Sequence, residues 1–220
     1  MKFNCSLFLL LILPFFGISQ ILDSLDIYDH KEYENQTLKV FSDKGLIKLQ
    51  VIKANVIKIN FFKTDSIDQE TSNQNNGAYI RITQNLDDIF MQTDSLLIII
   101  NKLDFTIKFE TLKEQIFTVN KSVLLSDTGN SFSLSTIKYE EFFNNKNKKL
   151  KYKTYKIKNI KAIYSSKKYA IYFQNTHNGY LELNSENLQI KYLDKSTSGY
   201  YFLAGSKEEM ERNSKLIQIN

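Results

Sequence analysis

Short runs that alternate apolar and polar residues fill most of this chain. The clearest run lies between residues 46 and 62, where Ile47 and Leu49 alternate with lysine and glutamine and the pattern later resumes. A period of two is typical of β-strands that bury one face and expose the other. Ala54 and Asn55 interrupt the alternation, so we expect two antiparallel strands joined by a turn at these residues.

Comparable strand patterns continue to about residue 205, and a single helix pattern follows them. Ser206 and Glu209 have the spacing of a capping box, which predicts a helix over residues 206–220. A polar stretch at 64–77 predicts a surface loop. Many short strands and one terminal helix favour an all-β, antiparallel β-sandwich over residues 36–205. The remaining predicted strands are 36–41, 79–83, 90–93, 95–100, 105–109, 116–119, 123–125, 132–139, 150–164, 169–174, 180–184, 188–193 and 200–203.

The first residues have the features of a secretory leader. A basic start, an apolar run over 7–16 and small residues before position 20 predict a signal peptide at 1–19 that is cleaved. The apolar run is shorter than the roughly 20 residues of a membrane span, so we expect none. The protein is therefore expected to be exported, to a periplasmic or extracellular location. Cys5 would leave with the leader, and the polar residues 20–35 predict a flexible N-terminal arm.

The net charge of +5 comes mainly from one segment, residues 144–161, which holds eight lysines. Basic patches of this kind can bind nucleic acid or anionic surfaces. An exported protein rarely meets nucleic acid, so we expect no nucleic-acid partner. Leu150, Tyr152 and Tyr155 are interleaved with the lysines. We interpret the segment as a solvated edge strand whose lysines prevent pairing with other chains.

Signatures of catalysis and of cofactors are scarce in the sequence. The chain has two histidines and one cysteine, without the three or four closely spaced ligands that zinc requires. It has no phosphate loop and no dinucleotide fingerprint, so we expect neither a metal nor a cofactor. Carboxylates occur as adjacent pairs, which point to opposite faces of a strand and do not make a glycosidase pair. These pairs are Asp87-Asp88, Glu140-Glu141 and Glu208-Glu209.

Two segments near the C-terminus, together with the helix, carry a family resemblance. The strand Tyr169–Asn175 reads YAIYFQN, and Gly199–Gly205 reads GYYFLAG directly before the capping box. This order of strand, strand and helix resembles the N-terminal domain of family 31 glycoside hydrolases, the α-glucosidase type. The strand meander at 95–119 is similar to that domain as well. The resemblance implies a galactose-mutarotase-like β-sandwich.

The resemblance also implies that this chain is not active alone. In the family, the helix leads into a catalytic barrel of about 250 residues, which 220 residues cannot hold beside a sandwich. The family's catalytic aspartates lie on that barrel in a motif with tryptophan, and this chain has no tryptophan. Residues 139–143 stand where the family has a glycine-containing loop, so no sugar subsite carries over there. The resemblance implies a non-catalytic domain or a truncated remnant.

Such a domain could bind carbohydrate by stacking aromatic rings on sugars and hydrogen-bonding their hydroxyls. The same domain could also dock on a separately encoded glycosidase barrel. Two alternatives stay open: an independent exported module that binds carbohydrate or the cell envelope, and a mutarotase-like epimerase. The epimerase would use His177 and Glu182 as acid and base. The residues predicted to bind carbohydrate are Tyr172, Asn175, His177, Tyr180, Tyr200 and Tyr201.

Overall fold

A computed structural model describes residues 23–25, 27–63, 78–112, 116–126, 129–174, 179–193 and 198–217. The predicted signal peptide at 1–19 and the predicted loop at 64–77 lie outside the described residues. Within the described ranges, no helix has both the length and the apolar character needed to cross a membrane.

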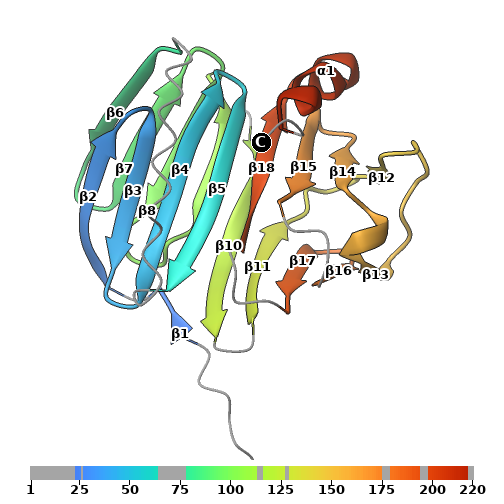
Figure 1. The fold of residues 1–220 in the computed structure, drawn as a ribbon, viewed down its shortest axis with the longest axis horizontal. Coiled ribbons are helices and arrows are strands. Elements are labelled where there is room, and N and C mark those ends of the chain that lie inside the picture. Colours follow the sequence, from blue (N-terminus) through green and yellow to red (C-terminus); the bar gives the residue numbers. More distant parts are fainter. Residues whose placement is uncertain are drawn as a thin grey trace, which may run out of the picture.

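The described residues form two antiparallel sheets and one α-helix (Figure 1). The ten-stranded sheet has the order β13-β16-β17-β11-β10-β9-β8-β7-β6, with β1 paired to β10. Its strands are β1 (Asp23–Ser24), β6 (Ile80–Gln84), β7 (Asp88–Thr93), β8 (Leu96–Asn101), β9 (Ile107–Thr111), β10 (Ile116–Ser126), β11 (Gly129–Ser135), β13 (Lys153–Lys156), β16 (Gly179–Leu183) and β17 (Asn187–Tyr192).

The second sheet has eight strands in the order β12-β14-β15-β18-β5-β4-β3-β2. Strands from the C-terminal part of the chain lie directly beside strands from the N-terminal part, because β18 pairs with both β15 and β5. The strands are β2 (Tyr28–Glu34), β3 (Thr37–Ser42), β4 (Gly45–Lys53), β5 (Val56–Lys63), β12 (Phe142–Asn144), β14 (Ala162–Ser165), β15 (Tyr169–Phe173) and β18 (Ser198–Ala204).

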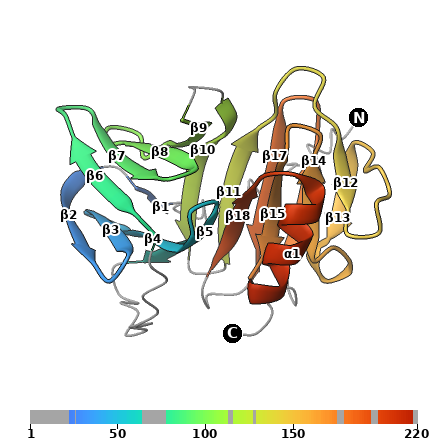
Figure 2. The same ribbon diagram turned by 90° about the horizontal axis from the view of Figure 1, so that it is seen from above.

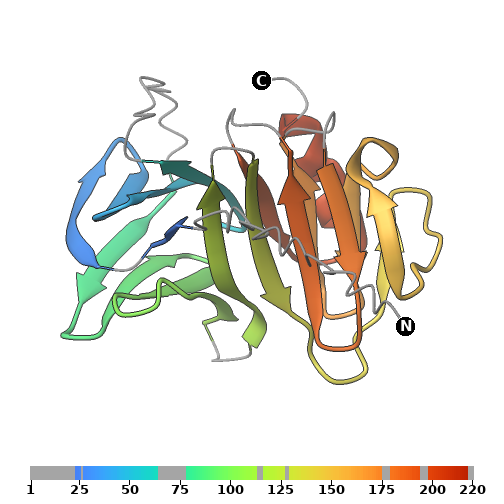
Figure 3. The same ribbon diagram turned by 90° about the horizontal axis from the view of Figure 1, so that it is seen from below.

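The main core lies between the two sheets, which face each other as layers (Figures 2 and 3). Aromatic rings cross the interface. Phe109 stacks on Phe202 with ring centroids 4.1 Å apart, and Phe132 stacks on Tyr200 at 4.8 Å. Each strand contributes alternate side chains to this layer, which is the physical basis of the alternation in the sequence. The predicted all-β sandwich is confirmed.

The helix α1 (Lys207–Ile217) covers part of the outer face of the eight-stranded sheet (Figure 2). Its Met210 packs in a second apolar cluster with Tyr172, Tyr201 and Leu203. One of the two hydrogen bonds of the predicted capping box is present: the Glu209 amide donates to the Ser206 hydroxyl at 3.2 Å. The Glu209 carboxylate does not close the capping box and instead accepts from the Asn55 side chain.

Several predicted boundaries differ from the structure. The flexible arm expected at 20–35 contains β1 and β2 instead, and β2 forms an edge of the eight-stranded sheet. The strands predicted at 116–119 and 123–125 are one strand, β10. The strand predicted at 150–164 divides into β13, the 3₁₀ turn η1 (Ile157–Asn159) and β14. The short strand β12 had no counterpart among the predictions.

Candidate carbohydrate-binding cleft

A cleft of about 530 Å³ lies where the terminal strands of the two sheets come together. The strand β12 ends the eight-stranded sheet and β13 ends the ten-stranded one, so the cleft uses the segments around both edges. Its volume lies within the range of about 300–1,000 Å³ that is common for ligand pockets. The lining residues are Tyr139, Glu140, Glu141, Phe142, Lys149, Leu150, Lys151, Tyr152 and Leu183.

Two tyrosines at the cleft are strongly exposed. The side chain of Tyr139 is 83% exposed and that of Tyr152 is 67% exposed. The face of an aromatic ring carries negative charge, which attracts the weakly positive C–H groups on one face of a pyranose. Two such rings beside one cleft provide surfaces on which a sugar ring can stack.

The turn that presents Tyr139 is fastened by the next residue, Glu140. The Glu140 amide donates to the Ile137 carbonyl at 2.9 Å. Its carboxylate accepts from the Ile137 amide at 2.8 Å and from the Ser165 hydroxyl. These bonds hold Tyr139 at a φ of 63°, a left-handed conformation that costs a non-glycine residue on the order of 1–3 kcal/mol. The backbone at Tyr139 is therefore held by contacts within the protein, and the Nζ of Lys138 lies 5.0 Å from the centroid of its ring.

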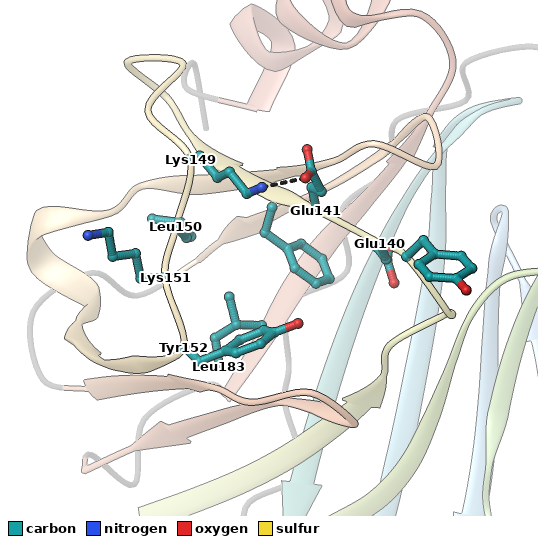
Figure 4. A pocket seen from close by; sticks show the side chains of 9 residues that line it. Glu140, Glu141, Lys149, Leu150, Lys151, Tyr152 and Leu183 are labelled. Carbon is teal, nitrogen blue, oxygen red and sulfur yellow. Dashed lines mark hydrogen bonds and ion pairs between the residues drawn. The ribbon is translucent and has the colours of Figure 1, made fainter.

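The opposite wall is fixed through hydrogen bonds to the backbone. The Tyr155 hydroxyl accepts from the Lys151 amide at 2.8 Å and donates to the Lys151 carbonyl at 3.0 Å. The Leu150 amide donates to the Phe142 carbonyl at 2.8 Å. Figure 4 shows the ion pair of Lys149 with Glu141 on one side and Tyr152 on the other. Both walls of the cleft are thus held by contacts within the protein.

Of the residues predicted from the sequence to bind carbohydrate, the four that the structure describes do not come together in one site. Tyr200 is fully buried between the sheets, and burial raises its pKa above the ordinary value. Tyr172 and Tyr201 are buried beneath α1. Their rings therefore present no open face. Tyr180 is 39% exposed on β16, and its role stays a prediction. Asn175 and His177 lie outside the described residues.

Strand alternation explains these positions. Tyr200 and Tyr201 are neighbours on β18, so one points into the main core and the other points to the outer face. The sequence does not show that a helix covers that outer face. Glu182 is exposed on β16, and the proposed acid–base pair with His177 stays untested.

Sequence reasoning missed Tyr139 and Tyr152. Both lie within or at the end of segments predicted as strands, 132–139 and 150–164, where alternation predicts a strand and does not show which side chains border a cleft. Among the residues that the structure describes, no group of three or more histidine, cysteine or acidic side chains is placed to hold a metal ion.

Comparison with known proteins gives matches at the level of structure. No model of a known protein family matches the sequence, and no curated protein matches it either. A family 31 dextranase from Flavobacterium johnsoniae, solved with isomaltotriose, matches with a TM-score of 0.70 and 16% identity over 84% of this chain and 27% of the enzyme. The cycloalternan-forming enzyme from Listeria monocytogenes, solved with a pentasaccharide substrate, has a TM-score of 0.66 and 10% identity, covering 83% and 21%.

A family 31 α-xylosidase from a soil metagenome, solved with xylose, has a TM-score of 0.61 and 7% identity over 81% of this chain and 32% of the enzyme. Identities this low establish a shared fold. The chain spans between about a fifth and a third of the length of these solved enzymes. The fold is that of a β-sandwich portion of family 31 glycoside hydrolases, which confirms the predicted resemblance.

Proposed function

We propose that this protein is a non-catalytic carbohydrate-binding β-sandwich related to the N-terminal domain of family 31 glycosidases. The observation that carries the proposal is the cleft with the exposed rings of Tyr139 and Tyr152. The fold likeness to enzymes solved with sugars supports a carbohydrate ligand. The signal-peptide pattern at 1–19 supports a place of action outside the cytoplasm.

The cleft offers the groups that sugar binding requires. Tyr139 and Tyr152 supply ring faces, while Phe142, Leu150 and Leu183 supply an apolar floor. Hydroxyls of a sugar can bond to the charged groups on the rim, as in other ligand pockets with few polar groups on an apolar lining. Because the walls are held in place, little conformational entropy is lost on binding.

Replacement of the two tyrosines tests this function. We expect Tyr139→Ala and Tyr152→Ala each to weaken oligosaccharide binding about tenfold, the loss expected for one stacking contact. Binding of a panel of neutral and acidic oligosaccharides would be measured by isothermal titration calorimetry. Tyr79→Ala is the matched control, because Tyr79 is 59% exposed beside β6 at the far edge of the ten-stranded sheet. Equal affinity in all four proteins would refute the proposal.

A second candidate function is docking on a separately encoded glycosidase barrel. It is supported by the solved enzymes, in which about two thirds or more of the chain lies outside the matched part. Co-expression with a barrel protein encoded nearby should then give a complex that copurifies and has α-glucosidase activity. A barrel that is fully active alone and does not copurify would contradict this function.

A further inference from the structure

Positive charge is concentrated around the cleft. Residues 138–161 contain nine lysines and two glutamates, a net charge of +7. The whole chain has 29 basic and 24 acidic residues, so everything outside this segment has a net charge of −2. The basic character of the protein therefore belongs to one segment, and that segment supplies eight of the nine residues that line the cleft.

The acidic groups nearby leave this charge largely uncompensated. Glu141 pairs with Lys149 at the rim. Glu140 is buried, and its carboxylate is turned toward Ser165 and Ile137. Glu182 on β16 lies across from Thr154 of β13. Within the described part of the chain, no carboxylate forms an ion pair with the exposed Lys151, which lines the cleft beside Tyr152.

Further lysines lie on the strands next to the cleft. β13 is an edge strand, so Lys153 and Lys156 stand at the border of the sheet. In the strand register, the exposed Tyr180 lies between Lys156 on β13 and Lys191 on β17. This group lies on the outer face of the sheet, whereas Lys153 is paired in register with the cleft-lining Leu183. Like charges at this density repel one another, and an anionic ligand would relieve that repulsion.

We propose that the cleft selects acidic oligosaccharides, of the uronic-acid type, over neutral ones. This inference rests on the proposed function. Tyr139 and Tyr152 receive the sugar ring, and Lys151 attracts the carboxylate that a uronic acid carries next to its ring. The further lysines on β13 interact with the carboxylates of neighbouring sugar units. Tyrosine rings stack on nucleobases as well as on sugars, so it is the expected export of the protein that favours a polysaccharide over nucleic acid as the source of the negative charge.

Two oligosaccharides of equal length, one acidic and one neutral, distinguish a cleft that selects acidic sugars from one that does not. Binding of tetragalacturonate and of maltotetraose to the full chain would be measured by isothermal titration calorimetry at low and at physiological salt. We expect tetragalacturonate to bind about tenfold more tightly at low salt. The preference should decrease as salt rises, because exposed charges are screened.

Substitution of one lysine tests the cause of the preference. In Lys151→Gln, the ratio of the two affinities should decrease severalfold toward one. Lys121→Gln is the matched control, because Lys121 is exposed on β10, three strands away from β16 in the sheet order, and the ratio should be retained.

Three other outcomes would overturn the inference, each for a different reason. Equal binding of both oligosaccharides, still sensitive to Tyr139→Ala, would refute acid selectivity and leave carbohydrate binding intact. Binding of neither oligosaccharide, nor of any other in the panel, would refute both. A duplex DNA oligonucleotide that binds more tightly than tetragalacturonate and displaces it would identify the surface as a nucleic-acid site.

Discussion

At the scale of single residues, Asn55 connects the turn between β4 and β5 to elements near the C-terminus. It lies in the turn between β4 and β5, where the sequence predicts a turn. Its amide nitrogen donates to the Ala204 carbonyl and to the Glu209 carboxylate, both at 2.8 Å. Its side-chain oxygen accepts from Asn213 at 3.3 Å. One side chain therefore joins this turn, the end of β18 and the helix α1.

The substitution Asn55→Ala should lower the free energy of unfolding by about 2 kcal/mol, because it leaves buried partners without a hydrogen bond. Urea unfolding followed by circular dichroism would measure the change. Asn145→Ala serves as the control, since Asn145 is exposed in the loop after β12, and its effect should be within about 0.5 kcal/mol. An equal loss in the two variants would contradict the role given to Asn55.

At the scale of elements, the alternation of apolar and polar residues could be read from the sequence. The covering of an outer sheet face by the helix α1 could not. The strands β4 and β5 and the turn between them were predicted because one face of each strand is apolar. The segment 150–164 also looks like one strand, yet it contains a turn. In this turn the Ile160 amide donates a hydrogen bond to the Ile157 carbonyl at 2.7 Å, and both isoleucines are buried. A spacing of three would place two side chains on opposite faces of one strand, so the step from Ile157 to Ile160 is a sign of the break that the prediction of a single strand did not use.

The cleft could not be predicted from local patterns, because it combines two stretches around an unpredicted strand, β12, with a residue of the other sheet. Leu183 belongs to β16, while Tyr139 and Tyr152 belong to irregular segments on either side of β12. Their proximity depends on the meeting of two sheet edges, which is a property of the tertiary fold. The left-handed backbone at Tyr139 also has no sequence signal, since tyrosine rarely adopts it.

At the scale of the whole molecule, the core contains fully buried tyrosines whose ionisation opposes folding. Burial raises the pKa of Tyr169, Tyr192 and Tyr200 above the ordinary value of 10.0. The unfolded chain releases these protons at about pH 10, and the folded chain retains them. Their contribution to stability is therefore complete below pH 10 and is lost as the pH rises above it.

We accordingly expect cooperative unfolding in alkali, with the β-sheet circular dichroism lost as part of the tyrosinate absorbance appears. A titration that follows both signals on one sample would test this. Ionisation of all 13 tyrosines with the β-sheet signal intact would contradict it.

The position of β18 has a consequence for how the protein is made. Ile59 on β5 pairs with Tyr200 on β18, and among the described strands none that is synthesised earlier takes that place. While the ribosome is still adding the residues in between, β5 has an unpaired edge and the inner aromatic faces cannot close. The sandwich therefore cannot be completed until nearly all of it has been translated, and the exposed edge of β5 needs protection from aggregation throughout that interval.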